Sequence, residues 1–125
     1  MTIFLDREAV LTVGSIAVEH AVEVGDWGLL DAAVARPQSS VFGVDAYPSL
    51  LEKAAAFLQS LARNHALIDG NKRTAWAAAW SFLYLNGVLL ADEYDVDAAE
   101  AFMYDVAKRG EMTIQEIASR LDEFT

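Results

Sequence analysis

The stretch TAWAAAWSFLYLNGVLLA, residues 74–91, contains no charged side chain. A run of about 18 residues lies at the lower limit for a membrane-spanning helix, but Asn86 and Gly87 interrupt it with a helix-stop signal. The uninterrupted part gives about 18 Å of helix, whereas the hydrocarbon core of a bilayer is about 30 Å thick. Because this part is apolar on all sides, it predicts the central buried helix of a small bundle, over residues 71–86.

The residues before this helix predict three more helices. Asp6 caps a first helix that runs to about Val22, with apolar residues at three- and four-residue steps. A short second helix covers residues 27–35, and Pro48 suits the first turn of a third. Residues 36–47 show no stable period and predict a surface loop without a β-hairpin.

Two further helices are predicted after the central one. A fifth helix follows a capping Asp95 or Asp97 and ends at Gly110. A sixth begins with the capping box formed by Thr113 and Glu116. The sequence therefore predicts an all-α fold, a single compact bundle of about six helices around a central buried helix.

Length and charge limit the classes of function. At 125 residues the chain is expected to form one domain, residues 1–125, long enough to bury one sound core. Nine Lys and Arg against 19 Asp and Glu give a net charge of -10. This charge argues against direct nucleic-acid binding and against docking on an anionic membrane. With no cysteine and no basic leader at its start, the sequence predicts a cytoplasmic protein.

The segment HALIDGNKRT, residues 65–74, carries the candidate chemistry. It contributes Lys72 and Arg73 to a cationic island, whereas residues 74–107 contain no Lys or Arg. The first N–H groups of a helix have no internal partner and lie at the positive end of the helix dipole, so this helix start predicts an anion site. Gly70 lets the backbone approach a ligand, and Asn71 can donate its amide to a phosphate oxygen.

Two other residues of the segment extend the anion site. Asp69 is a carboxylate among phosphate-binding groups, which fits an Mg²⁺ ion that bridges it to phosphates. His65 can act as a base near neutral pH. A base, a metal carboxylate and an anion cradle are the parts that phosphoryl or nucleotidyl transfer needs, because its catalysis is mostly positioning and charge stabilisation.

The same segment resembles the Fic-fold signature His-x-Phe-x-Asp/Glu-Gly-Asn-Gly/Lys-Arg. It is similar in particular to the Doc (death-on-curing) toxin branch, in which Lys follows the Asn. Residues 28–38, 57–65 and 82–87 also resemble Doc segments, so the resemblance covers nearly the whole chain. Two positions depart from the pattern: Ala66 replaces a frequent Pro, and Leu67 replaces the signature Phe, which anchors the loop in the core.

The resemblance implies a role for each matched residue. His65 would be the base that takes the proton from a target hydroxyl, and Asp69 would bind Mg²⁺. The pair Gly70 and Asn71 would shape the anion hole. Arg73 would contact the nucleotide phosphates, with Lys72 beside it. These last four residues would therefore form the phosphate-binding part of the site.

Lys72 bears on the reaction. Fic enzymes that transfer AMP usually have Gly there, whereas in the Doc branch a Lys fills that space and ATP presents its γ-phosphate. The resemblance therefore implies an ATP- and Mg²⁺-dependent protein kinase toxin that acts on elongation factor Tu, arrests translation and is neutralised by a Phd-like antitoxin. The alternatives are a Fic-type AMP transferase and a catalytically inactive antitoxin-binding module.

Other motifs receive structural interpretations. Residues 113–121 resemble the first helix of a helix-turn-helix, but too little chain follows for a recognition helix. The sequence shows no strand pattern that would bring scattered acids together as in a PIN-type ribonuclease. Glu19 faintly resembles the acid of a Fic self-inhibitory motif and is expected to be simply exposed, with His20 structural. The aromatic residues around Trp76 and Trp80 are expected in the core.

Overall fold

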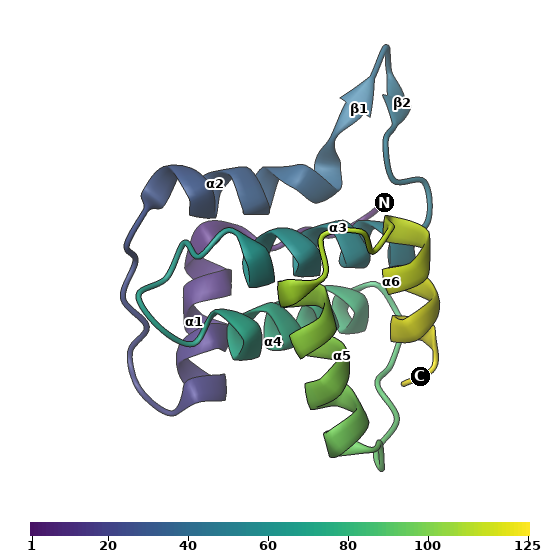
Figure 1. Cartoon of the computed structure of the whole chain (residues 1–125). Helices are drawn as coiled ribbons and strands as arrows, with labels where there is room; N and C mark the ends of the chain where they lie inside the picture. Colours follow the sequence, from purple (N-terminus) through teal and green to yellow (C-terminus); the bar gives the residue numbers. More distant parts are fainter.

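The computed structural model describes residues 1–125 and confirms an all-α fold with one small addition, a two-stranded hairpin (Figure 1). The α-helices are α1 (Arg7–Val18), α2 (Trp27–Ala35), α3 (Leu50–Arg63), α4 (Asn71–Leu85), α5 (Val96–Lys108) and α6 (Ile114–Asp122). Helices α3 and α4 run in opposite directions through the middle of the molecule. Helix α1 packs against α4, α2 lies over α3, and α5 and α6 lie on the other side.

Helix α4 is central, but it is buried along one side and not all round. Its middle supplies a row of buried small and aromatic residues, from Thr74 to Leu83. The first turn and Tyr84 are exposed, so the prediction of a helix buried on every side was wrong at both ends. Helix α1 crosses α4 at close range, because a Cβ on Gly14 would lie 2.6 Å from the Thr74 Oγ1. None of the helices has both the length and the apolar composition to cross a membrane.

The aromatic residues mostly pack in the core, as expected. Trp80 and Phe82 are buried, and the half-buried Trp76 packs edge-on against Phe124 with ring centroids 5.2 Å apart. Tyr84 is the exception, since it is exposed at the end of α4. The core therefore joins α4 to the C-terminal segment through aromatic contacts.

Residues 36–47 differ most from the prediction, because they contain a hairpin. A 3₁₀ turn over Arg36–Gln38 leads into β1 (Ser40–Val41), which pairs antiparallel with β2 (Val44–Asp45). The two loop residues Phe42 and Gly43 both have positive φ, 52° and 78°. Positive φ at both central positions is the requirement of the type I′ turn, whose twist matches that of paired strands.

The base of the hairpin is fixed to α3. Buried Lys53 forms an ion pair with Asp45 at 3.1 Å and donates to the carbonyl of Tyr47. Arg36 donates to the Tyr47 hydroxyl and to Gln59. The tip is exposed and projects from the body, away from the loop that joins α3 to α4 (Figure 1). Helix α3, which is about 21 Å long, separates the base of the hairpin from the loop that joins α3 to α4.

Two predicted helix boundaries in the N-terminal half move by several residues. Helix α1 ends at Val18 and not near Val22, because Glu19 takes φ 64° and the N–H of Val22 donates to the Ser15 Oγ. The third helix begins at Leu50 with Ser49 as its N-cap, so Pro48 precedes the helix instead of forming its first turn. The first of these changes lets the chain after α1 pair with the loop before α4.

In the C-terminal half the caps agree better with the prediction. Asp95, and not Asp97, caps α5, which ends at Lys108 before reaching Gly110. The Thr113 Oγ1 accepts from the N–H of Glu116, as expected. The second half of a capping box is missing, because the Glu116 carboxylate contacts the Thr113 hydroxyl and not its N–H.

Candidate active site

Helix α4 begins without a side-chain cap. Its N-cap residue is Gly70, in the left-handed region at φ 79°, and no side chain accepts a hydrogen bond from the first turn. The N–H groups of Asn71, Lys72 and Arg73 have no protein partner. A Cβ at Gly70 would lie 2.8 Å from the Val18 Cγ1, so only glycine fits against the end of α1. The helix start is therefore free to bind an anion with three backbone donors.

The loop before α4 is held by backbone pairing. Leu67 forms an isolated antiparallel bridge with Val24, and the N–H of Gly25 donates to the carbonyl of Ala66 at 2.8 Å. Both Ala66 and Leu67 are buried. The two residues that depart from the Fic signature therefore anchor the loop between α3 and the chain that follows α1.

Asn71 closes this loop on itself. Its Oδ1 accepts from the N–H of Leu67 at 3.1 Å, and its Nδ2 donates to the carbonyl of Leu67 at 3.0 Å. The sequence pattern predicts that this amide donates to a phosphate oxygen. In the structure its main contacts are with the loop, and a single amide hydrogen remains for a ligand.

His65 lies where the chain leaves α3. It has φ 52°, a conformation that few non-glycine residues adopt and that is commonest at functional sites and turns. The side chain is exposed and neither ring nitrogen has a protein partner. The ring is therefore free to accept a proton from a ligand, and the surrounding loop holds the strained backbone in place.

Asp69 is the one carboxylate at this helix start. Its Oδ1 accepts from the N–H of Gly70 at 2.8 Å, and the side chain is exposed. No group of three or more potential metal ligands exists in the structure. Mg²⁺ is commonly bound by one or two carboxylates together with water and substrate phosphates, so a single carboxylate beside a phosphate cradle fits this ion.

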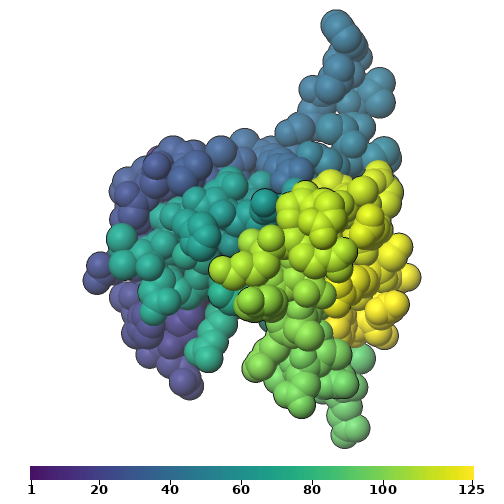
Figure 2. All heavy atoms as spheres, viewed as in Figure 1, coloured from purple at the N-terminus to yellow at the C-terminus, as the bar shows by residue number.

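The six residues singled out from the sequence line one cavity of about 500 Å³: His65, Asp69, Gly70, Asn71, Lys72 and Arg73. The other walls come from the end of α1, from α3 and from the end of α5. Figure 2 shows the surface hollowed where the teal residues at the start of α4 face the green residues of α5. A cavity of this volume is typical of small-molecule and cofactor sites.

Sequence reasoning missed two polar residues of this cavity, His20 and Lys108. His20 was expected to be structural, but it is exposed and lines the cavity, with its Nδ1 3.1 Å from the carbonyl of Ala21. Glu19 is exposed, as expected, and does not line the cavity. No local pattern marks either missed residue, because both reach the site through tertiary packing.

A second cavity of about 560 Å³ adjoins the first, and Lys72 and Arg73 line both. Its remaining walls are mostly apolar and come from α4, α5 and the loop between them, with Trp76, Tyr94 and Met103 among them. The site is therefore an extended cleft along α4 and α5, with a polar end and an apolar end.

A helix start with free donors, preceded by His and Asp and followed by Lys and Arg, is the local structure that the Fic signature encodes. The family model of the Fic/DOC family matches residues 4–83. The chain therefore belongs to the Fic/DOC family.

Two relatives place it within the family. The chain is 64% identical over 124 residues to "Toxin Doc" of Mycolicibacterium smegmatis, covering 99% of this chain and 95% of that protein. It is 33% identical over 98 residues to "Protein kinase doc" of Escherichia phage P1, covering 78% of this chain and 74% of the phage protein. These identities place the chain in the Doc branch of the family.

Proposed function

We propose that this protein is the toxin of a toxin–antitoxin pair and acts as a protein kinase that transfers the γ-phosphate of ATP to a hydroxyl of elongation factor Tu, arresting translation. The observation that carries the proposal is the convergence of His65, Asp69 and the cationic first turn of α4 on one cavity. The names of the two relatives support it, since one is called a toxin and the other a protein kinase.

The proposed transfer assigns one step to each group. The target hydroxyl oxygen forms a bond to the γ-phosphorus, the bond to the β–γ bridging oxygen breaks, and ADP leaves. The hydroxyl proton passes to a ring nitrogen of His65, which has no protein partner. The free N–H groups of α4 with Lys72 and Arg73 hold the phosphates and stabilise the transition-state charge.

Asp69 would hold Mg²⁺ through its exposed carboxylate. The ion would supply positive charge against the phosphate oxygens. Asn71 and Gly70 would position the cradle, Asn71 by its two bonds to Leu67 and Gly70 by its φ of 79°. The Asp69 carboxylate is exposed to a ligand, whereas Asn71 acts through its contacts with the loop.

Lys72 supports transfer of a phosphate rather than of AMP. In Fic proteins that transfer AMP this position is usually Gly, and here a lysine lines both parts of the cleft. The resemblance to the Doc branch, in which a Lys follows the Asn and ATP presents its γ-phosphate, supports transfer of the γ-phosphate here. AMP transfer is the second candidate function, and a Phd-like antitoxin that covers the cleft is the proposed partner.

The test is incubation of the protein with elongation factor Tu, Mg²⁺ and ATP labelled at either the α- or the γ-phosphate. The proposal predicts γ label on the target and none from the α position. Label from the α position would replace the kinase assignment with AMP transfer.

A His65→Ala variant is the matched control, because it removes the base from an exposed position. The absence of transfer from either label by the wild-type chain, together with intact antitoxin binding, would indicate an inactive binding module.

A further inference from the structure

Most of the cations in this molecule have a protein partner. Of the nine Lys and Arg residues, six form an ion pair or a hydrogen bond: Arg7, Arg36, Lys53, Arg63, Arg109 and Arg120. With 19 acids available in the chain, such pairing is easily achieved. A cation left without a partner is therefore an exception here.

The three exceptions are Lys72, Arg73 and Lys108, and all three line the same cavity. Lys72 and Arg73 belong to the family signature, whereas Lys108 is the last residue of α5 and far from them in sequence. Asp69 is the one carboxylate in the lining, so three cations and one anion leave this cavity with a net charge of about +2 beside the positive end of the α4 dipole. This excess of positive charge favours an anionic ligand that contacts α5 as well as α4.

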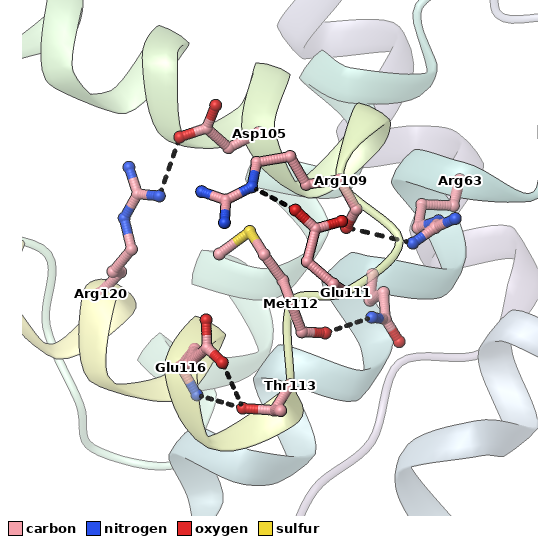
Figure 3. Close-up of polar contacts among 9 residues, drawn as sticks. Arg63, Asp105, Arg109, Glu111, Met112, Thr113, Glu116 and Arg120 are labelled. Atoms are coloured by element: carbon pink, nitrogen blue, oxygen red, sulfur yellow. Dashed lines mark hydrogen bonds and ion pairs between the residues drawn. The ribbon is translucent and has the colours of Figure 1, made fainter.

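The residues around Lys108 are turned to other partners. Figure 3 shows Arg109 Nε paired with Glu111 at 2.9 Å, and Arg63 donating to the carbonyl of Arg109 at 3.3 Å. The hydrogen bond from Arg109 lowers the pKa of Glu111 below its usual range. Arg120 is paired with Asp105 at 3.0 Å. These contacts fix the corner between α5 and α6 and leave Lys108 as its one cation that faces the cavity.

We propose that Lys108 is a third phosphate-binding cation, which holds the nucleotide from the α5 side and makes its affinity depend on the number of phosphates. The inference rests on the proposed function, since it takes the ligand of the cavity to be a nucleotide. A lysine at a helix C-terminus also interacts favourably with the dipole of its own helix. That interaction stabilises the fold but does not distinguish one nucleotide from another.

The contribution of Lys108 to nucleotide affinity is limited by the exposure of its side chain to solvent. Lys108 is exposed, so its attraction to a phosphate is screened, although charge-assisted hydrogen bonds are stronger than neutral ones. Loss of this charge is expected to weaken binding of a triphosphate about three- to fivefold, and binding of a monophosphate less than about twofold. A graded response of this kind is the property that a purely structural lysine would lack.

The experiment is titration calorimetry of the full chain with Mg²⁺ and each of three probes: adenylyl imidodiphosphate, ADP and AMP. The variant is Lys108→Met, and the matched control is Arg109→Met, which removes the same charge from the adjacent residue outside the cavity. Lys108→Arg is expected to restore most of the affinity, and Lys108→Glu to weaken triphosphate binding further. Thermal unfolding of each variant checks that the fold is intact.

Three results would overturn the inference. If the wild-type chain binds the triphosphate and Lys108→Met behaves as Arg109→Met does, the proposed function stands and Lys108 has no part in binding. Equal weakening of all three nucleotides would also contradict a phosphate-counting role. If the wild-type chain binds none of the three probes, the proposed function fails together with this inference.

Discussion

Five of the six α-helices begin on a side chain that accepts a hydrogen bond from their own first turn, whereas α4 begins on Gly70, which has none. The five caps are Asp6, Asp26, Ser49, Asp95 and Thr113. A side-chain cap at a helix start contributes about 1 kcal/mol. The chain therefore forgoes at α4 a stabilising contact that it makes at every other α-helix.

The difference shows how the same backbone groups serve stability at one helix and binding at another. At the capped helices an internal oxygen occupies the donors. At α4 the donors, Lys72 and Arg73 all lack an internal partner, and all of them lie at one cavity. Removal of a cap should therefore change only the free energy of unfolding, whereas a change at the α4 start should also affect nucleotide binding or transfer.

The largest effect is expected on activity when His65 is replaced. His65→Ala should lower the rate of phosphate transfer about 100-fold or more, the usual contribution of a general base. The free energy of unfolding should change little, because the ring has no protein partner. His65→Asn should be as inactive as His65→Ala. Its free energy of unfolding should equal that of the wild-type chain, since Asn tolerates the φ of 52°. Transfer assays with urea unfolding measure both quantities, and an active His65→Ala would exclude the base role.

Gly70→Ala should lower the free energy of unfolding by about 2–3 kcal/mol. A non-glycine residue at φ 79° is strained, and the added Cβ would lie 2.8 Å from the Val18 Cγ1. Adding Val18→Ala should remove the steric part of the loss and leave the conformational part. Urea unfolding of both variants measures this, and a stable Gly70→Ala would show that the close approach to α1 is not required.

Asn71→Ala should lower the free energy of unfolding by about 1–2 kcal/mol, because two backbone groups of buried Leu67 lose their partner. Asn71→Asp keeps the acceptor for the N–H of Leu67 and should lose less stability. It should nevertheless weaken nucleotide binding more, since it adds a negative charge at the cradle. Equal effects of the two substitutions on binding would contradict this division.

Asp95→Ala should lower the free energy of unfolding by about 1 kcal/mol, the usual loss for an N-cap. Nucleotide affinity should not change, because Asp95 caps α5 and does not line either cavity. Chemical denaturation with calorimetry separates the two quantities. A parallel loss of affinity would mean that capped and uncapped helix starts are not independent.

The sequence predicted the elements that depend on local patterns. Periodic apolar residues and caps such as Asp6 and Thr113 predicted the six helices, and the signature segment supplied six residues that meet in one cavity. These features lie within a few residues of one another. Short-range geometry was therefore enough to predict them.

The features that were missed depend on contacts between distant segments or on unusual backbone. The hairpin turns at Phe42 and Gly43, so the usual Asn-Gly signal for such a turn is absent from the sequence. Phenylalanine rarely adopts positive φ, and nothing local predicts that it does so here. Helix α1 ends early because its following segment pairs with Leu67. His20 and Lys108 reach the cavity from other elements, which no local pattern reveals.

The central claim is that the free N–H groups of Asn71, Lys72 and Arg73 bind the phosphates of a nucleotide. Amide NMR spectra of the chain, recorded with Mg²⁺ while adenylyl imidodiphosphate is added, test it most directly. We expect large downfield shifts of these three amides and little change at the capped first turn of α6, which lines neither cavity. Saturable binding that leaves the three amides unmoved, or no binding at all, would contradict it.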